Sequence, residues 1–151
     1  MSVEAKLAEL GLSVPEVAKP VAAYIPAVRS GSHIFTSGQL PMRSGQLIAT
    51  GKVGGEVTPE VAVECAQQCA LNALAAVKAE FGSLDDVRRV VKVVCFVAST
   101  PDFTGQPQIA NGVSELLGKV FGEAGIHARS AVGVPVLPLD APVEVELIVE
   151  V

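Results

Sequence analysis

A run of β-branched residues at positions 87–99 constrains this chain more than any other feature. Both faces of the run are apolar apart from Lys92, which predicts a strand that is covered on both sides. The molecule must therefore find a covering layer for each face of a sheet built around this strand.

Two long segments have the apolar spacing of helices that pack on such a sheet. Residues 59–81 carry one apolar stripe at spacings of three and four, between the N-cap Thr58 and the stop signal Gly82. Residues 107–122 repeat the pattern. A short amphipathic helix is also predicted within residues 1–12.

The remaining segments read as strands and connections. Residues 40–57 are rich in glycine and predict a long, mobile connection, and Lys19-Pro20 predicts a loop. The order of elements indicates an α+β fold, with a single sheet and both long helices on one of its faces. Strands are predicted at residues 22–28, 33–37, 87–99, 128–134 and 143–151.

The second face of that sheet has no covering layer in the sequence. Half of the chain is apolar, but only 4% is aromatic and there is no tryptophan, so the apolar surplus consists of many small side chains. We therefore expect other copies of the chain to cover this face.

Charge and cysteine content narrow the function classes. The net charge of −5, without a run of Lys or Arg, argues against nucleic-acid binding. Charged or glycine residues interrupt every apolar stretch before it could span a bilayer, and residues 1–12 lack a signal-peptide core. Three cysteines in apolar settings are typical of a reducing compartment, so a cytoplasmic protein is predicted.

Common catalytic and metal-binding signatures are absent from the sequence. Cys65 and Cys69 lie four residues apart on the first long helix, and they read either as small buried thiols or as part of a weak metal site. His127 reads either as a packed or surface residue or as a base.

Arg129 stands out because few other charges surround it in the sequence. It reads either as a structural ion-pair partner of a C-terminal glutamate or as a clamp for a carboxylate ligand. Alternation along residues 143–151 directs the valines to the helices and Glu144 to the opposite face. If residues 128–134 pair with this strand, Arg129 and Glu144 share that opposite face.

Several motifs together resemble one known family. Residues 128–134 (ARSAVGV), followed by Leu137-Pro138 and residues 143–146 (VEVE), are similar to the C-terminal signature of the Rid family. That family is also called YjgF and carries the older name L-PSP endoribonuclease. Further upstream matches are FTSGQLP at residues 35–41, Gln68 and Asn72, Asp102-Phe103, Asn111 and Glu115.

The resemblance implies a chorismate-mutase-like fold for one domain over residues 1–151, with residues 1–20 as an N-terminal helix and loop extension. It implies one mixed sheet with two long helices on one face. It also implies a homotrimer with a barrel-like core and three clefts between subunits.

The best-known members hydrolyse 2-imino acids such as 2-aminoacrylate to 2-oxo acids and ammonia without a cofactor or metal. By resemblance, Arg129 pairs with the substrate carboxylate and Glu144 orients the attacking water. Substrate contacts implied in the same way come from Tyr24, Ser37, Gly38, Asn111 and the backbone at Ala131.

The sequence departs from active members near the expected site. Ala131 stands where deaminases often have cysteine, and residues 125–128 replace a segment that often carries Phe and Pro. Two other functions therefore stay open. One is a non-catalytic binder or regulator that keeps the carboxylate clamp, and the other is a ribonuclease, against which the acidic charge counts.

Overall fold

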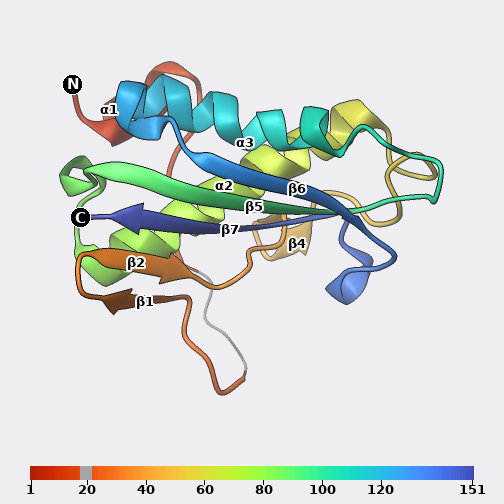
Figure 1. Ribbon diagram of the computed structural model, residues 1–151, viewed down its shortest axis with the longest axis horizontal. Helices are drawn as coiled ribbons and strands as arrows, with labels where there is room; N and C mark the ends of the chain where they lie inside the picture. The colour runs from red at the N-terminus through yellow and green to blue at the C-terminus, as the bar shows by residue number, and fades with distance from the viewer. Residues whose placement is uncertain (18–21) are drawn as a thin grey trace.

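One five-stranded mixed sheet, with two long helices on one face, forms the body of the protein (Figure 1). The structure is a computed structural model and describes residues 1–17 and 22–151, so the predicted loop at Lys19-Pro20 lies outside the described residues. The helices are α1 (Val3–Glu9), α2 (Pro59–Phe81) and α3 (Gln106–Phe121). The strands of the sheet are β1 (Ala27–Ser30), β2 (His33–Thr36), β5 (Arg89–Ala98), β6 (Ala128–Val134) and β7 (Val143–Glu150).

The strand order is β1-β2-β7-β5-β6, and only β5 and β6 run parallel. The last strand of the chain, β7, therefore lies in the middle of the sheet, and β6 forms an edge. The pairing of β6 with β7, on which a shared face for Arg129 and Glu144 depends, does not occur, because the connection between them carries the chain across β5, which pairs with both.

The two long helices form where their sequence signals predict. The Thr58 hydroxyl accepts a hydrogen bond from the Val61 amide at 3.3 Å, and Gly82 ends α2 with a φ of 103° that favours glycine. Helix α2 covers β1, β2 and β7, and α3 covers β5 and β6. No helix in the described ranges is both long and apolar enough to cross a membrane.

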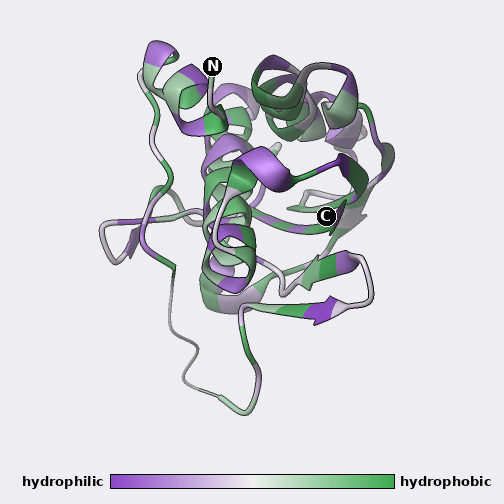
Figure 2. Ribbon diagram, turned by 90° about the vertical axis from the view of Figure 1, so that its left-hand side faces the viewer, coloured by the Kyte–Doolittle hydropathy of each residue, from purple (hydrophilic) through white to green (hydrophobic). Residues whose placement is uncertain are grey.

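The core lies between the helices and one face of the sheet. Val145, Leu147 and Val149 point into it and are buried, as the alternation of the last strand predicts. On the other face no helix of the described part of the chain covers the strands, as the side view shows (Figure 2). Phe35 and Val132 on that open face are 41% and 42% exposed, so this face remains uncovered within a single chain.

The glycine-rich connection at residues 40–57 is more ordered than predicted. It contains a small hairpin of β3 (Met42–Arg43) and β4 (Gln46–Leu47). Val53 in this connection is buried, and its amide donates to the Ala98 carbonyl oxygen at 2.8 Å. The strand predicted at residues 22–28 is also displaced, because regular pairing starts only at Ala27, after Pro26.

Candidate functional site

Arg129 lies on β6 with its side chain directed to the helices, not to the open face. It pairs in register with Val93, which is fully buried on the helix side of β5. Its Nη1 donates to Asn111 Oδ1 at 2.8 Å and to Ser114 Oγ at 3.2 Å. The two acceptors lie three residues apart on α3 and therefore share one face of that helix.

His127 completes a group around Arg129. Its Nε2 lies 2.8 Å from Ser114 Oγ, and its Nδ1 lies 2.6 Å from the Gly125 carbonyl oxygen. A carbonyl oxygen only accepts, so Nδ1 carries the hydrogen and Nε2 of the neutral ring accepts from the serine hydroxyl. We call Asn111, Ser114, His127 and Arg129 the arginine cluster.

Ser114 is the member of the arginine cluster that sequence reasoning missed. Its signal was its position three residues after Asn111 in the predicted helix, on the same helical face. His127, whose role the sequence left open, is a hydrogen-bonded member of the cluster.

Glu144 lies on the opposite face of the sheet. It pairs in register with Phe96 on the open face of β5, while its neighbour Val145 points into the core. The prediction that Arg129 and Glu144 share a face is therefore wrong. It failed because β5 separates β6 from β7, and the parallel register with β5 turns Arg129 toward the helices.

The backbone at Gly38 passes very close to the Glu144 side chain. A Cβ atom at Gly38 would overlap with Oε1 of Glu144, so only glycine leaves room for the carboxylate there. Gln39 and Val145 exchange backbone hydrogen bonds of 2.8 and 3.0 Å, which hold this segment against β7. Burial first, and then the nearby Glu146 carboxylate, raise the pKa of Glu144 above its ordinary value.

Ser37 connects this segment to the residues before β1. Its hydroxyl donates to the Ile25 carbonyl oxygen at 2.6 Å, and its amide donates to the Pro26 carbonyl oxygen at 2.7 Å. We call Ser37, Gly38 and Glu144 the glutamate cluster. Tyr24, just before β1, is 57% exposed, and Ala131 pairs with Cys95 on the helix side of the sheet. The structure therefore divides the predicted site residues between two places.

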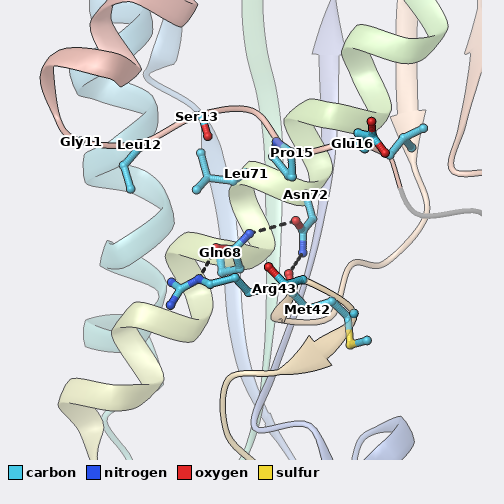
Figure 3. A pocket seen from close by; sticks show the side chains of 13 residues that line it. Gly11, Leu12, Ser13, Pro15, Glu16, Met42, Arg43, Gln68, Leu71 and Asn72 are labelled. Carbon is cyan, nitrogen blue, oxygen red and sulfur yellow. Dashed lines mark hydrogen bonds between the residues drawn. The ribbon is translucent and has the colours of Figure 1, made fainter.

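A separate cleft of about 730 Å³ lies between residues 11–17, the β3–β4 hairpin and α2. Figure 3 shows its polar wall, in which Arg43 donates to Gln68 and Gln68 donates to Asn72. Asn72 in turn donates to the Leu40 and Met42 carbonyl oxygens at 2.9 and 3.0 Å. Gln68 and Asn72, both on α2, thus hold in place the segment that follows Gly38.

The cysteines are buried thiols, as one of the two readings of Cys65 and Cys69 predicts. Burial raises the pKa of Cys65 to about 11 and of Cys95 to about 12, so neither is a reactive thiolate. Among the residues that the structure describes, no three His, Cys, Asp or Glu side chains gather as metal ligands would.

The sheet, its helices and the FTSGQ and ARSAV segments define a YjgF-like α+β domain. A family model described as "YjgF/chorismate mutase-like, putative endoribonuclease" matches residues 4–151. The chain therefore belongs to the Rid/YjgF family, as its motifs predict.

Relatives agree with this assignment. Protein TCP17 of Trypanosoma cruzi is 44% identical over 149 residues, which are 98% of this chain and 93% of that protein. A protein of Dermatophagoides farinae named 2-iminobutanoate/2-iminopropanoate deaminase is 34% identical over 91% of this chain and 93% of its own length. The crystal structure of Atu1372 from Agrobacterium tumefaciens, a protein described as of unknown function, superposes with a TM-score of 0.94 at 46% identity, covering 99% and 93% of the two chains.

Proposed function

We propose that this protein binds small 2-imino acids through Arg129 and hydrolyses them to 2-oxo acids and ammonia without a cofactor. The observation that carries the proposal is the state of the Arg129 guanidinium, which is half-buried and has no carboxylate partner among residues 1–17 and 22–151. The alternative interpretation of Arg129 was an ion pair with a C-terminal glutamate, and Arg129 makes no such ion pair among these residues.

The hydrogen bonds of Arg129 leave one edge of the guanidinium available. Only Nη1 is used, and both of its acceptors are uncharged oxygen atoms. Within the described residues, the N–H groups of Nε and Nη2 have no acceptor. These two nitrogens form the fork that binds a carboxylate through two parallel hydrogen bonds.

The chemistry needs little more than a bound carboxylate and an activated water. The carbon of a 2-imino acid is already electrophilic, so water adds to it and the resulting aminoalcohol expels ammonia to leave the 2-oxo acid. A carboxylate with a raised pKa is a stronger base for removing the proton from that water. Glu144 has this property, and we assign it that role.

Arg129 and Glu144 act on one substrate in this proposal only if they come from different copies of the chain. They lie on opposite faces of the sheet, with β5 between their strands. Arg129 is on the edge strand, and the open face around Glu144 carries exposed apolar residues that a second copy would cover. We therefore propose a homotrimer with a barrel-like core and its sites between subunits.

A non-catalytic carboxylate binder is the second candidate. The observation that favours it is that one chain holds the arginine cluster complete, without any contribution from Glu144. Binding of 2-oxo acids without any release of ammonia from imino acids would support this candidate over the deaminase.

The compartment we propose is the cytoplasm. All three cysteines are unpaired and buried, which fits a reducing environment.

The direct test generates 2-imino acids in situ with an amino-acid oxidase and measures ammonia and 2-oxo acid. Arg129→Ala loses two charge-assisted hydrogen bonds, so we expect kcat/KM to fall by about 100-fold or more. Lys119→Ala, which removes an exposed cation from the last turn of α3, is the control for the loss of one positive charge and keeps the wild-type rate. Equal rates for wild type, Arg129→Ala and buffer would refute the deaminase proposal.

A site shared between copies makes a further, specific demand. Arg129→Ala and Glu144→Gln are each inactive alone, but when coexpressed they form mixed trimers in which about one quarter of the sites hold both native residues. Recovery of activity in the mixture supports the shared site. A solution mass equal to that of one 15.5 kDa chain would refute it.

A further inference from the structure

We propose that Ser114 and His127 are positioning residues that hold Arg129 in the orientation that binds a carboxylate. This inference rests on the proposed function, because it concerns how the clamp is kept ready. In this proposal, neither Ser114 nor His127 contacts the substrate.

The hydrogen bonds of the arginine cluster run in a single direction. The Gly125 carbonyl oxygen accepts from Nδ1 of His127 at 2.6 Å, which leaves Nε2 as an acceptor. Nε2 therefore accepts the Ser114 hydroxyl hydrogen at 2.8 Å. With its hydrogen directed to His127, Ser114 Oγ presents a lone pair to Arg129 Nη1 at 3.2 Å.

Close packing fixes the position of the Gly125 carbonyl oxygen, at which this series of hydrogen bonds ends. Gly125 is buried in the turn after α3, and a Cβ atom at that position would overlap with the Leu117 carbonyl oxygen. The turn can therefore rest directly on the α3 backbone, which places the Gly125 carbonyl oxygen and His127 beside Ser114.

An arginine on an edge strand needs such an anchor. An arginine side chain has many rotamers, and a clamp that is not held must lose this freedom when the ligand binds. Asn111 is exposed, so water competes for its bond to Arg129, whereas Ser114 is half-buried on the inner side. Both anchors use Nη1 and leave the Nε and Nη2 edge for the ligand.

A purely structural role for Ser114 and His127 would tie α3 to β6 without affecting the ligand. The two readings differ in what a substitution changes. A structural tie affects the free energy of unfolding alone. A positioning pair affects ligand affinity, and a substitute that restores the hydrogen bond restores the affinity.

The experiment measures binding of 2-oxobutanoate by calorimetry, with KM and kcat for the imino acid and the melting temperature measured on the same proteins. Ser114→Ala and His127→Ala are expected to raise Kd and KM by about tenfold, the equivalent of one hydrogen bond to a charged group, with a smaller change in kcat. His127→Gln, whose side-chain oxygen can accept from Ser114, and Ser114→Thr are expected to recover most of the affinity. Ser99→Ala removes a half-buried serine hydroxyl just after the C-terminal end of β5 and should leave Kd unchanged.

The outcomes separate this inference from the proposed function. Wild-type affinity in folded Ser114→Ala and His127→Ala, with weakened binding in Arg129→Ala, would overturn the positioning role alone. Failure of both His127→Gln and Ser114→Thr to restore affinity while folded would also overturn it. Wild-type affinity in Arg129→Ala would overturn the proposed function and this inference together.

Discussion

The arginine cluster and the glutamate cluster lie on opposite faces of one sheet and are built differently. The arginine cluster is a set of side-chain hydrogen bonds between α3 and the edge strand β6. The glutamate cluster is a close approach of backbone to one carboxylate, which Gly38 permits. Neutral side-chain oxygen atoms hold the Arg129 guanidinium through hydrogen bonds, whereas the Glu144 carboxylate lies in the space that the absence of a side chain at Gly38 leaves.

In the proposed function, neither cluster forms a complete site alone. Among the residues that the structure describes, only Nη1 of Arg129 has hydrogen-bond acceptors, so Nε and Nη2 can bind a ligand. Glu144 lies on the open face of the sheet, where burial of its carboxylate and then the nearby Glu146 raise its pKa. Perturbing each half separately therefore tests whether the division between them is real.

The largest effect is expected from Gly125→Ala, which disturbs the arginine cluster. The added Cβ overlaps with the backbone of Leu117, which cannot move independently of α3, so we expect a loss of about 3 kcal/mol in the free energy of unfolding. Urea denaturation measures this loss. Gly118→Ala is the matched control, because nothing lies near its Cβ and alanine favours the helix. Equal stability of Gly125→Ala and wild type would show that the turn is not packed as described.

A smaller and different effect is expected from Gly38→Ala in the glutamate cluster. Here the added Cβ meets the end of a flexible side chain, so Glu144 moves away and the fold loses less than about 1 kcal/mol. In the proposed mechanism the displaced carboxylate no longer holds the water, so we expect kcat to fall by about tenfold. Activity and urea denaturation are measured on the same protein. A stability loss as large as that of Gly125→Ala would erase the contrast between the clusters.

The pH dependence of stability gives a third comparison. The pKa of Glu144 is raised in the folded state from an ordinary value of 4.5, so the folded protein binds this proton more tightly than the unfolded chain. Its contribution to stability therefore declines as pH rises above that value. Glu144→Gln should be more stable than wild type at pH 7, with the difference shrinking at pH 4.

Denaturation at the two pH values checks this sign. Glu115→Gln, which removes an exposed carboxylate from α3, is the control for the loss of one charge. A Glu144→Gln variant that is less stable than wild type at pH 7 would contradict the raised pKa.

The smallest effect is expected from combining Arg129→Ala and Glu144→Gln within one chain. Because β5 separates the two residues on opposite faces, their effects on monomer stability should add within about 0.5 kcal/mol. A double-mutant cycle at a concentration where the chain is dissociated measures the coupling. Strong coupling there would place the two residues in contact within one chain.

Sequence patterns predicted the elements well wherever the signal is local. The N-cap at Thr58 and the stop at Gly82 bound α2, and the alternation along β7 correctly separates buried from open positions. These features depend on residues that are near one another in the chain. The family could also be recognised, because its motifs are short and occur in order.

The face of Arg129 could not be predicted, because it depends on strand order rather than on local pattern. Consecutive strands often pair, but β6 and β7 flank β5 instead. Once β6 is assigned a parallel register with β5, Arg129 follows Val93 toward the helices. Ser114 was missed for a related reason, since its importance appears only when α3 lies against β6.

The central place of β7 has a consequence for how the protein is made. When a ribosome has produced the chain through β6, strands β2 and β5 still lack the partner that joins them. Both then present unpaired backbone edges, which are sites for pairing with other chains. The two parts of the sheet join only when residues 143–150 emerge from the ribosome. Aggregation is therefore most favoured when many chains are synthesised close together, or when the chain lacks its C-terminal strand.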